Sequence, residues 1–212
     1  MAVHFQEKCI KKAARRAAHK LLLPLTPSDL EKIRALFIDV KQTELSLKDL
    51  EFFPNITICY IFSTKGWFFQ LKDDSSLKCL SKLEILSLAN CTYNEAAPLN
   101  LPDIKTLALE NTCFKNLEFL SLLPKLEDLS LSGRSFHNID FLKDLNSLTC
   151  LEIAHTCIKD ITPLQNFTNL KELYFEDNSI TDYSITRTLK ELDLLSIDGV
   201  EIPKEEFLKQ TH

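Results

Sequence analysis

Apolar residues recur along the chain at a nearly constant interval. The same apolar position returns at Leu83, Ile104, Leu126, Leu148, Leu170 and Leu192. The last four of these steps are equal in length, and the first is one residue shorter. Seven apolar positions between Leu126 and Leu145 each have an apolar counterpart one period later. So many matches at one fixed offset identify an internal repeat.

Each repeat predicts one short strand and one short return. The unit opens with LxxLxL, whose last part alternates with period two, as a strand does. Its later apolar positions step by three, which favours a 3₁₀ or irregular helical return: Phe136, Ile139, Leu142 and Leu145. Stacked units share one continuous core. The sequence therefore predicts an α/β fold, a curved right-handed superhelix with a parallel sheet on its concave face and helical returns on its convex face.

The repeat continues less regularly toward the N-terminus. Residues 33–38 and 56–61 have the strand spacing and are separated by close to one period. The step from Ile56 to Leu83 is longer than a period, which indicates inserted residues. We therefore predict about eight repeats over residues 31–202, the first two irregular, with an insertion near 63–76.

Both ends of such an array need a cap, because an open end exposes core and a strand edge. Residues 4–22 suit an amphipathic helix, so we predict an N-terminal cap over residues 1–30 and a C-terminal cap over 203–212. The apolar side of the predicted helix holds Phe5, Cys9, Ile10, Ala13, Ala14, Ala17 and Leu21. Its other side is basic. Contact with a membrane surface, an acidic partner or nucleic acid, or a role as a targeting presequence, are alternatives to the cap.

Two units, PKLEDLSLSGRSFHNIDFLKDL and TNLKELYFEDNSITDYSITRTL, resemble the 22-residue repeats of internalins and of the leucine-rich regulatory subunit of protein phosphatase 1. The resemblance covers residues 83–202 and implies a leucine-rich-repeat solenoid. Such arrays regulate, scaffold or neutralise a protein partner, and some are pathogen effectors. In this class the ninth repeat position usually carries asparagine; here it holds Cys91, Thr112, Arg134, Thr156, Asn178 and Val200. Because an unpaired arginine is costly to bury, we expect the turn at Arg134 to be distorted or to point outward.

Composition narrows the possible functions. Only three glycines are present, so no glycine-rich phosphate loop can be written. The seven cysteines are odd in number and form no CxxC pair, which predicts reduced thiols and a cytoplasmic location. No apolar run is long enough to span a membrane, and the N-terminus does not read as a secretory signal. We expect no cofactor and no bound metal.

The concave face is the predicted binding surface. In the six regular repeats, positions 2, 3, 5 and 7 hold nine acids and two bases in 24 positions, against 19 acids and nine bases in the whole segment 83–202. A concave face of one sign attracts a partner of the opposite sign. We therefore predict a basic protein surface or peptide as the partner, and no nucleic acid at this face. The alternative is that these positions are polar for solubility alone. The predicted contacts are Tyr174, Glu152, Glu176, Glu172, Asp128, Glu127, Glu110 and Asp198.

The two N-terminal strands predict a second contact patch. Phe37, Tyr60 and Phe62 occupy outward positions, and Trp67 lies in the insertion. Either these aromatics form an exposed apolar patch, or the inserted loop folds over them and buries them.

His155 lies close in sequence to both Cys157 and Cys150, which raises the question of a nucleophile beside its base. His155 and Cys157 fall in the turn after a predicted strand. A catalytic cysteine needs a positioned base and a lowered thiol pKa, whereas the neighbours of this turn are acidic. We therefore predict no catalytic residues and a non-enzymatic protein. A cysteine-dependent enzyme is the remaining alternative.

Overall fold

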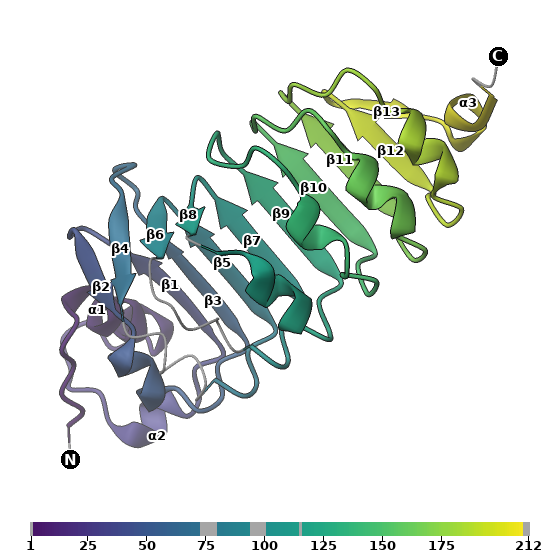
Figure 1. Cartoon of the computed structure of the whole chain (residues 1–212). Coiled ribbons are helices and arrows are strands. Elements are labelled where there is room, and N and C mark those ends of the chain that lie inside the picture. The colour runs from purple at the N-terminus through teal and green to yellow at the C-terminus, as the bar shows by residue number, and fades with distance from the viewer. Residues whose placement is uncertain (1, 73–79, 94–100, 115, 210–212) are drawn as a thin grey trace.

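The computed structural model describes residues 2–72, 80–93, 101–114 and 116–209. The chain winds as a solenoid whose strands lie side by side from one end of the molecule to the other (Figure 1). One sheet has nine strands, in the order β1-β3-β5-β7-β9-β10-β11-β12-β13. Their bounds are β1 (Ala35–Asp39), β3 (Ile58–Phe62), β5 (Ile85–Ala89), β7 (Thr106–Glu110), β9 (Asp128–Ser132), β10 (Cys150–Ala154), β11 (Glu172–Glu176), β12 (Leu194–Ile197) and β13 (Val200–Ile202).

The repeat period sets the pairing of this sheet. Leu151 on β10 lies opposite Leu129 on β9 and Leu173 on β11, each of which is its counterpart in the neighbouring repeat. All three are buried, and so is Ile153. The pairs from β1 to β12 are parallel. The predicted solenoid with its long parallel sheet is therefore confirmed.

The return side carries short 3₁₀ helices, as the step of three predicts. They are η1 (Lys48–Phe52), η3 (Glu118–Leu122), η4 (Asp140–Leu142), η5 (Thr162–Asn166) and η6 (Ser184–Thr188). The N–H of Leu142 donates to the carbonyl of Ile139, and the N–H of Leu145 donates to that of Leu142, both at 2.9 Å. The apolar spacing is thus the spacing of the i to i+3 hydrogen bonds.

A second sheet, which the sequence did not suggest, lies on the return side of the first repeats. Its four parallel strands are β2 (Glu44–Ser46), β4 (Phe69–Lys72), β6 (Cys91–Tyr93) and β8 (Cys113–Phe114). Strand β4 lies in the predicted insertion and pairs with both β2 and β6. Its residues Phe69 and Leu71 are buried. The insertion therefore contributes buried residues to the core as well as a surface loop.

Buried polar groups connect neighbouring turns at the ninth repeat position. Thr156 is fully buried, and its N–H and hydroxyl donate to Asn178 Oδ1 at 3.2 and 2.6 Å. The amide of Asn178 donates to the carbonyl of Ile153 at 2.7 Å. Arg134, at the equivalent position, is exposed and pairs with Asp177 at 2.8 Å. The expectation that the turn at Arg134 points outward is confirmed.

A helix caps the N-terminal end, but it is shorter than the predicted 4–22. Helix α1 (Lys8–Ala17) packs against β1 with Ile10, Ala13 and Ala14 buried. Before it, the N–H groups of Gln6 and Glu7 donate to the buried Asp49 carboxylate at 3.0 and 2.6 Å.

Helix α1 ends in a left-handed turn at His19, whose φ is 53°. The apolar side of the predicted helix therefore stops early, and Leu21 is 66% exposed. Ala17 is exposed as well, so the predicted places of Ala17 and Leu21 on the buried side are wrong. A second short helix, α2 (Pro27–Leu30), follows. The cap boundary at residue 30 stays a prediction.

The C-terminal end is closed by a strand that reverses direction. Strand β13 pairs antiparallel with β12, and α3 (Lys204–Lys209) follows it. The cap boundary at residue 202 stays a prediction. None of the described helices is long and apolar enough to cross a membrane.

Candidate partner-binding surfaces

Strands β9, β10 and β11 bring four of the predicted contacts together. Cys150 on β10 lies opposite Asp128 on one side and Glu172 on the other, and Glu152 lies opposite Tyr174. Residues directly opposite in a sheet point to the same face. Asp128, Glu152 and Glu172 therefore surround Cys150 and Tyr174, and we call these five residues the acidic cluster.

The carboxylates of the acidic cluster raise the pKa values of its two other side chains, Cys150 and Tyr174. Burial raises the pKa of the Cys150 thiol to about 11, and Glu172, Asp128 and Glu152 add to the shift. Tyr174 donates its hydroxyl to Glu172 Oε2 at 2.9 Å, and this bond raises the pKa of Tyr174 to about 12. No ion pair to the cluster's three carboxylates occurs within the described ranges. Their charge is therefore available to a partner.

Glu201 is a further acid on this face, which the repeat pattern did not predict. Because β13 runs antiparallel, Glu201 lies opposite Ser196, which in turn lies opposite Tyr174. Its charge also helps to raise the pKa of Tyr174. The repeat register does not put residue 201 on this face, so only the reversal of the last strand could have revealed its position.

The other four predicted acids lie outside this cluster. Glu110 and Glu176 end strands β7 and β11 and are exposed. Glu127 precedes β9 and lines a groove with Lys105 and Lys171, so its surroundings are mixed in charge. Asp198 accepts a hydrogen bond from the Asp177 N–H at 2.8 Å, which engages its carboxylate in a turn.

The second predicted patch is only partly assembled. Phe37 is 55% exposed and stacks on Tyr60, with ring centroids 5.1 Å apart and planes at 8°. Phe62 is half-buried further along β3. Trp67 is 53% exposed and lies under Lys65 Nζ, 4.7 Å from the ring centroid. The inserted loop therefore does not bury Phe37 or Trp67.

The surroundings of Phe37 are basic. A groove between α1 and the start of β1 is lined by Phe37 with Arg16, Lys32 and Arg34, among others. The N-terminal end of the long sheet thus has the opposite charge to the acidic cluster.

His155 owes its place to backbone conformation. Its φ is 55°, and the equivalent positions in other repeats are also left-handed: Asn90, Asn111, Gly133 and Asp177. Asparagine, aspartate, histidine and glycine tolerate this region best. At Gly133 a Cβ would stand 2.8 Å from the Asn111 Cα, so glycine is required there. The turn chemistry explains His155 without a catalytic role.

Cys150, one of the two cysteines near His155, is poorly suited to nucleophilic attack. The raised pKa of Cys150 keeps it protonated near neutral pH. The nearest charged partner of His155 is Asp177 Oδ2, 3.2 Å from Nδ1. In the part of the chain that the structure describes, no three His, Cys, Asp or Glu side chains are grouped to hold a metal.

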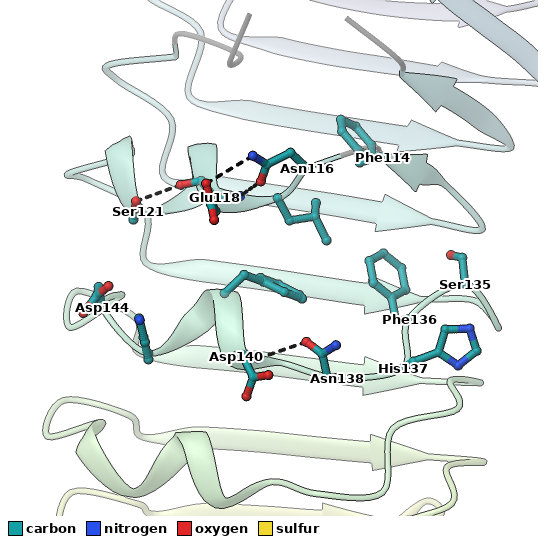
Figure 2. Close-up of a pocket in the computed structure, with 13 residues that line it drawn as sticks. Phe114, Asn116, Glu118, Ser121, Ser135, Phe136, His137, Asn138, Asp140 and Asp144 are labelled. Atoms are coloured by element: carbon teal, nitrogen blue, oxygen red, sulfur yellow. Dashed lines mark hydrogen bonds between the residues drawn. The ribbon is translucent and has the colours of Figure 1, made fainter. Parts of the chain in front are cut away.

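Figure 2 shows a hollow on the convex side, where the second sheet gives way to 3₁₀ returns. Two of its polar side chains cap these returns: Asn116 Oδ1 accepts from the Glu118 N–H at 2.7 Å, and Asn138 Oδ1 from the Asp140 N–H at 3.3 Å. Asp160 caps Thr162 in the same way one repeat later. These caps are thus a repeating structural feature, which accounts for part of the polarity of the hollow.

The fold is similar to that of solved internalin structures. Internalin C2 from Listeria monocytogenes matches over 98% of this chain and 91% of its own, with a TM-score of 0.70 at 25% identity. A second internalin from that organism, inlF, covers 91% of this chain and 76% of its own, with a TM-score of only 0.42 at 19% identity, and carries no argument. No protein-family model matches the sequence, and no curated protein does.

The fold and the repeat define a leucine-rich-repeat solenoid, a fold that supports a protein-interaction module. The chain is a leucine-rich-repeat protein of internalin-like fold. The resemblance to the phosphatase regulatory subunit stays a prediction.

Proposed function

We propose that this chain binds a basic protein surface or peptide through the acidic cluster, and thereby scaffolds, regulates or neutralises its partner. The observation that supports this most is the convergence of Asp128, Glu152 and Glu172 around Tyr174 on adjacent strands. Strands position side chains rigidly, so a partner's bases meet a preformed array.

Tyr174 is the proposed anchor of the contact. Its ring is half-buried between strands, and its hydroxyl is fixed by Glu172. Aromatic residues in such central positions often dominate binding energy. Ser130 and Ser196 are short neighbours in the same row, which leaves room for long lysine or arginine side chains.

We also propose that the protein works in a reducing, cytoplasmic compartment. Six cysteines in the described ranges are free, and Cys59 and Cys91 are fully buried thiols. Free thiols of this number are typical of reducing compartments.

Binding of a labelled lysine- and arginine-rich peptide, measured by fluorescence anisotropy against an acidic peptide of equal length, tests the proposal. The variant Glu152→Lys/Glu172→Lys should bind at least about thirtyfold more weakly, and Tyr174→Ala about tenfold, as for contacts central to an interface. The matched control Glu51→Lys/Asp144→Lys changes the net charge equally at exposed positions away from the cluster. Equal losses in the test and control variants would refute a site at the cluster.

A further inference from the structure

The outward side of α1 is a basic surface at the end of the solenoid. Ile10, Ala13 and Ala14 are buried against the first repeat, which turns the opposite side of the helix toward solvent. This outward side carries five bases, which line one groove together with Leu21: Lys8, Lys11, Lys12, Arg15 and Arg16. Within the described residues, none of these five bases forms an ion pair. We call this set the basic cap face.

Three consecutive leucines project beside the basic cap face. Leu21, Leu22 and Leu23 are 66%, 93% and 62% exposed. A run of large apolar side chains in water is unfavourable, and none of the three belongs to the core or packs against it. The chain returns to the core at Leu25, which is buried.

The fold holds this leucine loop at both ends by polar contacts. The N–H of Lys20 donates to the Arg15 carbonyl at 2.9 Å, which closes the end of α1. The ammonium of Lys20 then pairs with Asp29 at 2.8 Å, and Asp29 also accepts the Thr26 N–H at 2.8 Å. These bonds hold the pKa of the Asp29 carboxyl far below its usual range. A hydrogen-bonded turn therefore holds the three leucines in an exposed position.

We propose that the basic cap face and the Leu21–Leu23 loop bind a bilayer that contains anionic lipids. Bases beside exposed apolar side chains match a membrane interface, where the bases meet headgroups and the leucines enter the acyl boundary. A soluble polyanion would use the bases but gives the leucines no apolar environment. The combination therefore favours lipid.

The charge distribution also sets the orientation of the solenoid on the membrane. Residues 1–30 carry six bases and two acids, whereas the whole chain has a net charge of −5. Helix α1 lies at one end of the molecule and the acidic cluster on strands β9 to β11, well along the sheet (Figure 1). An anionic bilayer attracts the cap and repels the cluster. The solenoid then stands with its N-terminal end on the membrane and the acidic cluster away from it.

Sedimentation of the full chain with vesicles tests the proposal. We expect binding to phosphatidylcholine vesicles containing phosphatidylserine, and none to phosphatidylcholine alone. The variant Lys8→Glu/Lys12→Glu/Arg16→Glu should bind at least about 100-fold more weakly, since each base near an anionic surface contributes about fivefold. The control Lys143→Glu/Lys159→Glu/Lys190→Glu changes the net charge equally at exposed positions elsewhere and should lose far less. Absence of wild-type binding, or equal losses in both variants, would overturn the proposal.

Substitution of the leucines separates a lipid site from a general polyanion site. Leu22→Gln should weaken vesicle binding by about tenfold, whereas Leu122→Gln, at an exposed leucine of η3, should not. Both substitutions are on the surface, so circular dichroism should show unchanged folding. If Leu22→Gln binds vesicles as the wild type does while heparin displaces the protein fully, the surface is a polyanion site and the lipid proposal is wrong.

Discussion

The two halves of the solenoid share one long sheet but differ in what lies on the other side of the core. In the first repeats, β2, β4, β6 and β8 form a second sheet, whereas from β9 onward the described return side is formed by 3₁₀ helices and turns. The hydrogen bonds inside the two halves differ as well. Asn178 makes three hydrogen bonds across the turns of the C-terminal half, while Thr112 Oγ1 in the N-terminal half is buried without a partner among the described residues. The strand is therefore the part of the repeat that both halves share, whereas the return differs between them.

The exposed surfaces of the two halves differ in the same way. The N-terminal half presents bases with Phe37 and Tyr60, and the C-terminal half presents the acidic cluster. One fold therefore carries two surfaces of opposite charge, and each can be disturbed separately.

The largest expected effect is at the N-terminal cap. Ile10→Ala removes a fully buried side chain and should lower the free energy of unfolding by about 3 kcal/mol. At the C-terminal closure, Val200→Ala should change it by less than about 0.5 kcal/mol, because Val200 is 65% exposed. Urea denaturation measures both. Similar costs at the two ends would show that the helix is not the stronger closure.

The hydrogen bonds of Asn178 should give the next largest effect. Asn178→Ala removes three bonds and leaves the buried hydroxyl and N–H of Thr156 without their acceptor. We expect a loss of about 2 kcal/mol in the free energy of unfolding, again from urea denaturation. An unchanged midpoint would mean that water replaces these bonds.

Thiol chemistry should distinguish the acidic half from the rest of the chain. The raised pKa of Cys150, about 11, lowers its thiolate fraction at pH 8. We expect iodoacetamide to label Cys150 about tenfold more slowly than the exposed Cys113, after allowing for the greater intrinsic reactivity of a more basic thiolate. Peptide mass spectrometry resolves the two sites. In Glu152→Gln/Glu172→Gln the labelling of Cys150 should accelerate; faster labelling than Cys113 in the wild type would revive the cysteine-enzyme alternative.

The smallest effect is expected at Thr112. Because its buried hydroxyl makes no bond within the described residues, Thr112→Val should leave the free energy of unfolding unchanged or raise it by up to about 1 kcal/mol. The same substitution at Thr156 should be destabilising, which makes it the matched control. A clear loss of stability in Thr112→Val would indicate that its hydroxyl is satisfied.

The repeat spacing was enough to predict the long sheet and its core, since seven apolar positions from Leu126 to Leu145 recur one period later. The second sheet could not be predicted in this way. Its strands are two to four residues long, and such short alternations are indistinguishable from turns. Leu21 was misplaced because helical periodicity does not show where a left-handed turn ends the helix.

The concave surface was predicted in part. Asp128, Glu152, Glu172 and Tyr174 follow from the repeat register, and the structure places them together. Glu201 does not follow from it, because its position depends on the reversal of β13. The register predicted Asp198 on this face, whereas the structure has it in the turn after β12, with a φ of 50° and a hydrogen bond from the Asp177 N–H.

The unbroken pairing of β9, β10 and β11 means that the length of the molecule depends on the number of its repeats. Each repeat unit advances the structure by one strand, or about 4.8 Å, while both caps remain unchanged. Duplicating Leu148 to Asn169 in the gene would therefore lengthen the molecule by one fixed increment. Recombination between neighbouring units in the gene would add or remove whole repeats in the same way. The length of such a protein can therefore change in steps of one repeat while its two caps stay the same.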